Sequence, residues 1–254
     1  MAFIVSFSSC RDVKLSNHLP NSDYSNFDLQ NSEIDYFVKV NQLTDSTFQV
    51  IYRDTIAVSL NPTFHTKVLD LKINNQRLHE YPVLLLDLYR DLSYKKFQLL
   101  VTEFRKLLFQ KFILKLDKGK YLLTRHFPIQ PEESVFLDAR IKENLRPPSL
   151  FKEFYPLFNQ NDYVVFGLEN KTVHIYDSTG KSIPDFTDYM ITHKQFITFY
   201  KLEEKNTYQD YVYLISKIMK MLENINNSSS ISEMEKDYKL ILLNHSFLDY
   251  FRDN

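Results

Sequence analysis

Two stretches of the chain repeat one pattern of apolar and polar positions. The second stretch begins with a β-branched and aromatic run at 196–200, continues through polar residues at 203–206, and reaches Thr207 before an apolar stripe. The stripe recurs every three or four residues, the spacing that gathers side chains on one face of an α-helix. Its members are Tyr211, Leu214, Ile215, Ile218 and Leu222. The pattern predicts a strand that leads into a helix capped by Thr207.

The same order of features occurs 114 positions earlier. A shift of 114 residues lays 83–108 over 197–222 without a gap, so that Tyr94 meets Tyr208. The apolar stripe of the earlier copy is Phe97, Leu100, Val101, Phe104 and Leu108. Any two amphipathic helices can be brought into phase, so the prediction of a tandem duplication rests on the joint order of strand, polar gap, hydroxyl cap, tyrosine and helix. Two copies are too few for a solenoid.

Shorter patterns fill the rest of the chain. Period-two alternation and β-branched runs predict strands at 34–41, 48–52, 55–60, 83–86, 111–116, 121–124, 163–168, 172–176 and 238–243. Short helices are predicted at 133–143, at 150–158, and at 184–192 with Pro184 in the first helical position. A less regular helical face spans 62–81.

These elements predict an α+β fold: two tandem small α/β units, each a mixed β-sheet with an amphipathic helix packed on one face. Five of the nine prolines fall between positions 128 and 156. Because proline interrupts helices and sheets, this stretch marks a boundary. The expected divisions are a first unit at 34–127, a connector with short helices at 128–160, and a second unit at 161–254.

The first ten residues carry a signal about location. An apolar run ends in two small residues and Cys10, the single cysteine of the chain. This order resembles the lipobox of a bacterial lipoprotein, where the signal peptide is cut before the cysteine and the thiol is acylated. No Lys or Arg precedes the run, and Phe7 stands where Leu is usual. A start codon assigned too far downstream would explain the missing basic residues and the short run. The open alternative is an N-terminal strand with a buried cysteine.

Residues 11–33 are rich in Ser, Asn and Asp and contain few apolar residues. If residues 1–10 are the remnant of a signal peptide that ends at Cys10, this segment is expected to be a flexible tether that lets the folded body stand off a membrane. If Cys10 carries no lipid, the same segment is expected to be a disordered N-terminus.

Composition excludes several classes of site. The net charge is −1 with 25% charged residues, so no global field attracts nucleic acid. The three glycines stand apart, and no phosphate-binding loop or nucleophile elbow exists in the sequence. The seven histidines form no HExxH motif, and one cysteine offers neither a disulfide nor a cysteine metal cluster. The sequence therefore predicts no catalytic, cofactor-binding or metal-binding residues.

The order strand, strand, short helix, strand, longer helix and strand at 161–243 resembles the periplasmic domain of the biopolymer-transport ExbD/TolR family. The residues that carry the resemblance are 197–208, which hold the strand, the charged turn and the tyrosine, and then Val212, Ile215 and Met219 of the helix. The likeness extends more faintly to 34–116. It implies a related fold and an envelope location. That family has an N-terminal transmembrane helix with a carboxylate for proton-driven work, and no apolar run near 18 residues occurs in this sequence.

Two classes of function stay open. The first is a non-catalytic bacterial cell-envelope protein, anchored to the membrane only through lipid on Cys10 and facing the periplasm or the cell surface. It would use no cofactor and would bind an envelope protein or the cell wall. The alternative is a hydrolase-like enzyme whose site is assembled from distant loops. A deep pocket with several carboxylates or histidines would favour the enzyme, and an exposed edge strand or a flat aromatic patch would favour the binder.

Overall fold

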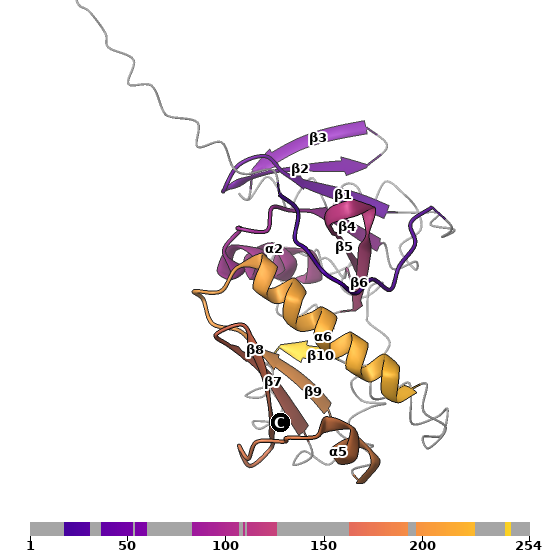
Figure 1. Cartoon of the computed structure of the whole chain (residues 1–254). Helices are drawn as coiled ribbons and strands as arrows, with labels where there is room; N and C mark the ends of the chain where they lie inside the picture. Colours follow the sequence, from indigo (N-terminus) through magenta and orange to yellow (C-terminus); the bar gives the residue numbers. More distant parts are fainter. Residues whose placement is uncertain are drawn as a thin grey trace, which may run out of the picture.

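The structure, a computed structural model, describes residues 18–30, 37–52, 54–59, 83–106, 109, 111–125, 163–192, 197–226 and 242–244. The strands of this part are β1 Phe37–Gln42, β2 Thr47–Tyr52, β3 Asp54–Ser59, β4 Val83–Asp87, β5 Lys111–Lys115, β6 Tyr121–Arg125, β7 Tyr163–Glu169, β8 Thr172–Asp177, β9 Ile197–Lys201 and β10 Leu242–Asn244 (Figure 1). Its helices are α2 Tyr94–Lys106, α5 Phe186–Thr192 and α6 Tyr208–Asn226, with a 3-10 turn η1 at Asp117–Gly119. The helices predicted at 62–81, 133–143 and 150–158 lie outside the described residues, as does Cys10.

The strands form two mixed sheets, which confirms the predicted α+β class. The first sheet has the order β3-β2-β1-β4-β5-β6, and the second has the order β10-β9-β7-β8. In the first sheet β1, β4 and β5 run parallel and β2 runs antiparallel to β1. In the second sheet β7, β9 and β10 run parallel and β8 runs antiparallel to β7. The arrangement β2-β1-β4-β5 therefore recurs as β8-β7-β9-β10, with β10 in the place of β5 as the sequence predicted.

Continuous apolar runs explain the central strands. β4, β5 and β7 each bury three consecutive residues, so side chains on both faces of these strands are buried over that length. Strands that are buried on both faces contain apolar runs instead of alternating apolar and polar residues. The hairpin of β5 and β6 is joined by η1, where Lys118 and Gly119 adopt positive φ angles of 57° and 68°. Gly119 suits that position because it has no Cβ to clash.

Both long helices begin at the hydroxyl residues that the sequence marked as caps. Ser93 Oγ accepts a hydrogen bond from the Lys96 N–H at 3.4 Å. Thr207 Oγ1 accepts one from the Asp210 N–H at 3.3 Å, and Asp210 Oδ2 accepts one from the Thr207 N–H at 2.9 Å. This reciprocal pair is a capping box, which satisfies two donors that the first turn would leave unpaired.

The short helix α5 begins later than predicted. The sequence placed its first residue at Pro184, but α5 starts at Phe186. Asp185 caps it, because its Oδ1 accepts hydrogen bonds from the N–H groups of Thr187 at 2.9 Å and Asp188 at 3.1 Å. An aspartate at the N-cap satisfies two unpaired donors, which a proline at that position cannot do.

The two long helices meet at their N-terminal ends through a reciprocal pair of backbone hydrogen bonds. The Tyr94 N–H donates to the Asn206 carbonyl at 2.8 Å, and the Tyr208 N–H donates to the Leu92 carbonyl at 2.7 Å. Tyr94 and Tyr208 are 114 positions apart, as are Leu92 and Asn206. Replacing each residue by its equivalent 114 positions away turns one hydrogen bond into the other, which is the relation that a two-fold axis produces.

The ring contacts at this junction follow the same relation. Phe97 and Tyr211 are equivalent residues, and their ring centroids lie 4.6 Å apart. The pair Phe97–Tyr208 at 4.8 Å corresponds to the pair Tyr94–Tyr211 at 6.1 Å. A contact in which residue i of one unit meets j of the other, and j meets i, is the isologous type found in two-fold dimers.

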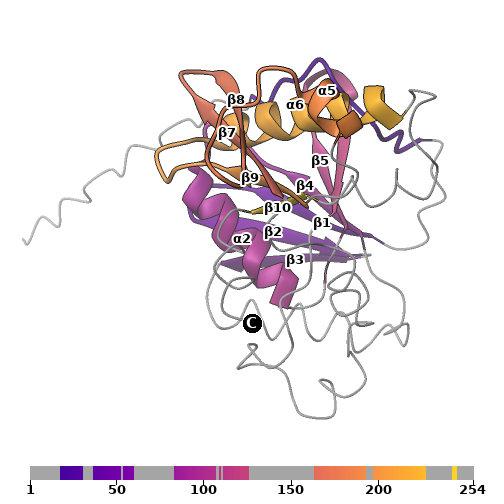
Figure 2. The ribbon, with the colours of Figure 1, turned by 90° about the horizontal axis from the view of Figure 1, so that it is seen from below.

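The two units share one hydrophobic core. A single cluster of buried side chains includes Phe48 and Leu86 of the first sheet, Phe166 of the second, and the stripes of both helices. Within the stripes, Phe104 of α2 and Ile218 of α6 are completely buried. Figures 1 and 2 show the helices meeting at their N-terminal ends and diverging from there, and in Figure 1 α6 lies between the sheets.

The segment 18–30, here called the strap, joins the two units from outside. The Arg90 N–H donates to the His18 carbonyl at 3.0 Å. The Asn21 N–H donates to Gln209 Oε1 of α6 at 2.7 Å. Figure 1 shows the strap in indigo, passing β6 and α6.

Further contacts fix the middle of the strap. Ser22 Oγ and Ser216 Oγ of α6 are hydrogen-bonded at 2.8 Å. Tyr24 is partly buried against the core, and burial, together with a hydrogen bond that its hydroxyl donates to the Glu223 carboxylate, raises its pKa to about 12. The sequence predicted a flexible tether over 11–33, so this prediction is corrected for 18–30. Two polar side chains of this segment bind the body: Ser22 bonds to the second unit, and Asn26 bonds to the backbone of Leu123 in the first.

Candidate functional site

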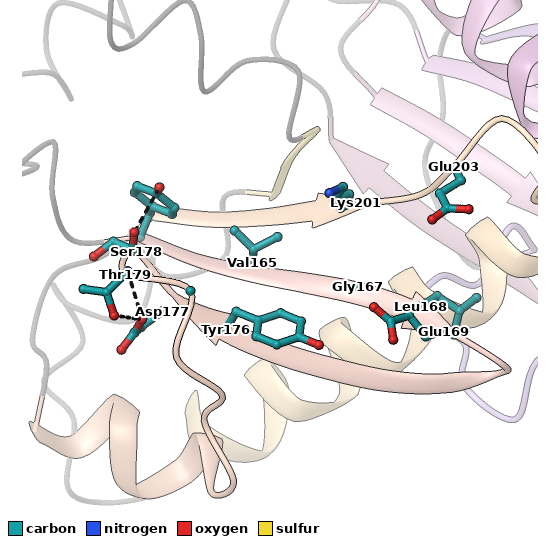
Figure 3. Close-up of a pocket in the computed structure, with 12 residues that line it drawn as sticks. Val165, Gly167, Leu168, Glu169, Tyr176, Asp177, Ser178, Thr179, Lys201 and Glu203 are labelled. Carbon is teal, nitrogen blue, oxygen red and sulfur yellow. Dashed lines mark hydrogen bonds between the residues drawn. The ribbon is translucent and has the colours of Figure 1, made fainter.

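The candidate site is a groove on the outer face of the second sheet, the face turned away from α6. Side chains alternate along a strand, so Val164 and Phe166 of β7 enter the core while Val165 and Gly167 face outward. The strand register places Tyr176 of β8 beside Val165, and Lys201 of β9 beside Gly167. The groove is an open hollow of about 330 Å³ that crosses β7, β8 and β9 (Figure 3).

Gly167 forms the floor of the groove. Its missing side chain leaves a trough between β8 and β9, and the Tyr176 ring lies alongside it. A Cβ atom built on Gly167 would lie 3.9 Å from Tyr176 Cε2, an ordinary contact distance, and the backbone there is not left-handed. The glycine is therefore not required by the backbone conformation. Its consequence is an open surface where another residue would place a side chain.

Aromatic rings wall one end of the groove. The Tyr163 ring meets Phe199 edge to face at a centroid distance of 5.6 Å, and the Tyr163 hydroxyl donates to the Ser178 carbonyl at 3.3 Å. The Tyr176 ring stacks with His174 of the same strand at 6.4 Å. These contacts hold the tyrosines in place. Large rings with fixed positions offer apolar contact area at a small entropic cost of binding.

The turn after β8 uses its carboxylate for structure. Asp177 Oδ1 accepts hydrogen bonds from the Thr179 hydroxyl at 2.6 Å and from the Thr179 and Lys181 N–H groups, each at 2.9 Å. The bond from the Thr179 hydroxyl is the main cause that lowers the pKa of Asp177. Gly180 completes the turn with a positive φ of 83°. Asp177 thus stays ionised and shapes the rim of the groove.

Charged residues rim the other end, where Glu169, Lys201 and Glu203 lie (Figure 3). Glu203 Oε2 pairs with Lys205 Nζ at 2.6 Å, and this hydrogen bond lowers the pKa of Glu203 and raises the pKa of Lys205. A carboxyl group that serves as a general acid near neutral pH needs a raised pKa. Glu203 therefore acts as a solvated charge of the rim.

The structure describes only some of the features that the sequence predicted. Cys10 lies outside the described residues, so its acylation stays a prediction. Among the described residues, no group of three or more His, Cys, Asp or Glu side chains is placed to hold a metal ion. No helix in that part of the chain is long and apolar enough to span a bilayer.

Sequence reasoning missed the groove, although one signal pointed to it. Gly167 interrupts an otherwise apolar strand, and a glycine inside a strand often marks a place of close approach by another backbone or a ligand. The other lining residues gave no signal because they come from three strands whose register the sequence does not show. Tyr176 and Lys201 are 25 positions apart in the chain.

Comparison with known proteins adds no relative. No family model matches the chain, and neither a curated protein nor a solved structure matches it. The resemblance of 161–243 to ExbD/TolR periplasmic domains therefore stays a prediction.

Proposed function

We propose that the chain is a non-catalytic binding protein of the bacterial cell envelope and that the groove on its second sheet holds an envelope protein partner. The observation that carries this proposal is the groove itself: it is open, floored by Gly167 and walled by Tyr163 and Tyr176. Aromatic side chains on an open surface are typical of recognition sites. The acidic groups Asp177 and Glu203 have lowered pKa values, which suits a charged rim and not proton transfer.

A photo-crosslinking experiment tests the groove. The photoreactive amino acid p-benzoylphenylalanine would replace Tyr176 and, in a matched control, Ile51. Ile51 is opposite Lys39 of the first sheet as Tyr176 is opposite Val165 of the second. Illumination of cells is expected to yield a crosslinked partner from position 176 and none from position 51. Equal crosslinking from both positions, or none from 176, would contradict the proposal.

The proposed location rests on Cys10. An acylated N-terminal cysteine carries more than one acyl chain, which is needed for stable anchoring because a single chain binds only marginally. Among the described residues, the first backbone hydrogen bond from the strap to the body is at His18, eight positions after Cys10. Eight residues span at most about 26–29 Å. The body would then sit close to the membrane, on a shorter leash than the sequence suggested.

Replacing Cys10 in the full-length gene tests the anchor. The Cys10→Ala variant is expected to leave the membrane fraction while its thermal unfolding stays unchanged, because the residue contributes only the lipid attachment. A Cys10→Ala protein that stays in the same fraction as wild type and unfolds at a lower temperature would support the alternative, an N-terminal strand with a buried cysteine.

A further inference from the structure

Within the described residues, one sheet edge next to the groove has backbone groups without partners. There β8 ends the second sheet: it pairs with β7 on one side, and on its other side Tyr176 forms a single bridge with Ser182. The two strands are joined by a two-residue turn, in which Asn170 and Lys171 have φ angles of 49° and 62°. Such turns match the twist of the strands they join. β8 is therefore a regular strand, and its side away from β7 is an edge of the sheet.

The hydrogen bonds after β8 show which of its peptide groups point outward. The Ile175 carbonyl accepts a bond from the Ile183 N–H at 2.8 Å, and the Asp177 N–H donates to the Lys181 carbonyl at 2.9 Å. Both bonds lie on the side away from β7. Peptide groups along a strand alternate in direction, so the N–H groups of Val173 and Ile175 and the Val173 carbonyl also point outward. Within the described ranges no hydrogen bond reaches these three groups.

The first sheet leaves fewer free backbone groups: β2, the strand equivalent to β8, is paired with β3, and the strap covers part of the far edge at β6. Phe27 of the strap forms a bridge with Tyr121 of β6. The Asn26 side chain accepts a hydrogen bond from the Leu123 N–H at 2.7 Å and donates to the Leu123 carbonyl at 3.2 Å. Exposed edges pair readily with other chains, and proteins usually cover them or place Lys or Pro on them. β8, with the sequence Thr-Val-His-Ile-Tyr-Asp, has neither residue.

We propose that the partner adds an extended segment of its own chain to β8 as a further strand. This inference rests on the proposed function and names the form of the ligand. The peptide backbone would bond to the outward groups of Val173 and Ile175. Every second side chain of the added strand would lie on the outer face, next to His174 at the margin of the groove, because Ser182 already lies beside Tyr176.

The geometry favours a peptide over the two other occupants. The stretch 172–175 spans about 14 Å at the rise of an antiparallel strand. Two copies of the chain paired only over this length would bury far less than the roughly 1,000 Å² of a stable interface. A cell-wall glycan does not present amide donors and acceptors at the regular spacing of a strand. A flexible peptide can use the ladder and still reach the groove.

The test uses seven-residue peptides selected from a random library on the full chain, and compares their affinities for three proteins. In Val173→Pro the outward N–H is removed at an edge position, where proline is tolerated. In the control Val173→Thr a β-branched residue keeps the N–H. Val173→Pro is expected to bind at least tenfold more weakly than wild type, and Val173→Thr equally well. Because Val173 packs against the core, both variants are expected to unfold at a somewhat lower temperature, and circular dichroism checks that both are folded at the binding temperature.

Amide hydrogen exchange of the wild-type protein, with and without peptide, tests strand addition even if Val173→Pro fails to fold. The bound peptide is expected to slow exchange of the Val173 and Ile175 amides at least tenfold. Several results would overturn strand addition: no selected peptide, no added protection, equal affinity for Val173→Pro, or a wild-type dimer that Val173→Pro dissociates. A Gly167→Asn variant separates the two proposals. If Gly167→Asn loses peptide binding and Val173→Pro keeps it, the groove is the binding site and strand addition to β8 is rejected.

Discussion

The outer faces of the two sheets differ at equivalent positions. The strand registers place Phe37 opposite Val83 in the first sheet and Tyr163 opposite Ile197 in the second. When each strand is counted from these two equivalent pairs, Val165, Gly167 and Lys201 of the groove correspond to Lys39, Asn41 and Asp87 of the first unit. Asp87 Oδ2 lies 2.6 Å from Lys115 Nζ and 3.7 Å from Lys39 Nζ.

The difference shows how one backbone arrangement supports two kinds of surface. In the first unit, side chains occupy the trough and an ion cluster neutralises Asp87. In the second unit, a glycine leaves the trough empty, and Lys201 stands where Asp87 would be. The buried stripes of the two helices remain apolar at equivalent positions. Packing thus constrains the inner faces of both sheets, while the outer faces are free to diverge toward function.

The largest expected effect tests whether the inner faces are equivalent. Phe104 and Ile218 are equivalent and completely buried. Phe104→Ala is expected to lower the free energy of unfolding by about 3–5 kcal/mol and Ile218→Ala by about 2–5 kcal/mol, because each leaves a cavity. Denaturant unfolding measures both, with Leu99→Ala as the control, since Leu99 is 54% exposed. A loss below about 1 kcal/mol at only one of the two positions would break the equivalence.

A smaller effect tests the strap, which has no counterpart in the second unit within the described residues. Ser22→Ala removes the 2.8 Å hydrogen bond to Ser216 and the 3.0 Å bonds of the same hydroxyl with the Tyr24 backbone, and a loss of about 0.5–1.5 kcal/mol per bond is expected. Ser25→Ala, at an exposed position three residues further on, is the matched control. If both variants unfold at the same denaturant concentration as wild type, the strap does not hold the units together.

The junction of the helices can be tested by a double-mutant cycle. The Phe97→Leu and Tyr211→Leu variants and their combination would be unfolded in denaturant. Because the rings meet at 4.6 Å, a coupling of about 0.5–1.5 kcal/mol is expected beyond the sum of the single losses. The pair Phe48→Leu and Tyr211→Leu serves as a comparison across the core. Purely additive losses for Phe97 and Tyr211 would mean that the junction is not a specific contact.

Much of the fold could be predicted because it depends on local patterns. The apolar run at β4, the hairpin of β5 and β6, and the hydroxyl caps of α2 and α6 are each visible within about fifteen residues. The start of α5 was misplaced because Pro184 and Asp185 compete for the same turn, and the better hydrogen-bond acceptor forms the cap.

The strap and the groove could not be predicted, for two physical reasons. The strap binds through polar contacts such as that of Asn26 with Leu123, and these leave no apolar period in the sequence. The groove depends on which residues of β7, β8 and β9 lie opposite one another. Parallel strands such as β7 and β9 are joined by a long connection, so their register is set by the packed structure and not by a turn.

The most direct test of the account fills the groove with the residue of the other unit. Gly167→Asn places in the second sheet the residue that stands at position 41 of the first, and the contact distances around Gly167 allow it without backbone strain. Affinity for the partner captured through position 176 would be measured by titration calorimetry, with thermal unfolding as the control for folding. We expect binding to weaken at least tenfold while the unfolding temperature stays the same. Wild-type affinity in a correctly folded Gly167→Asn protein would contradict the claim that this groove is the binding site.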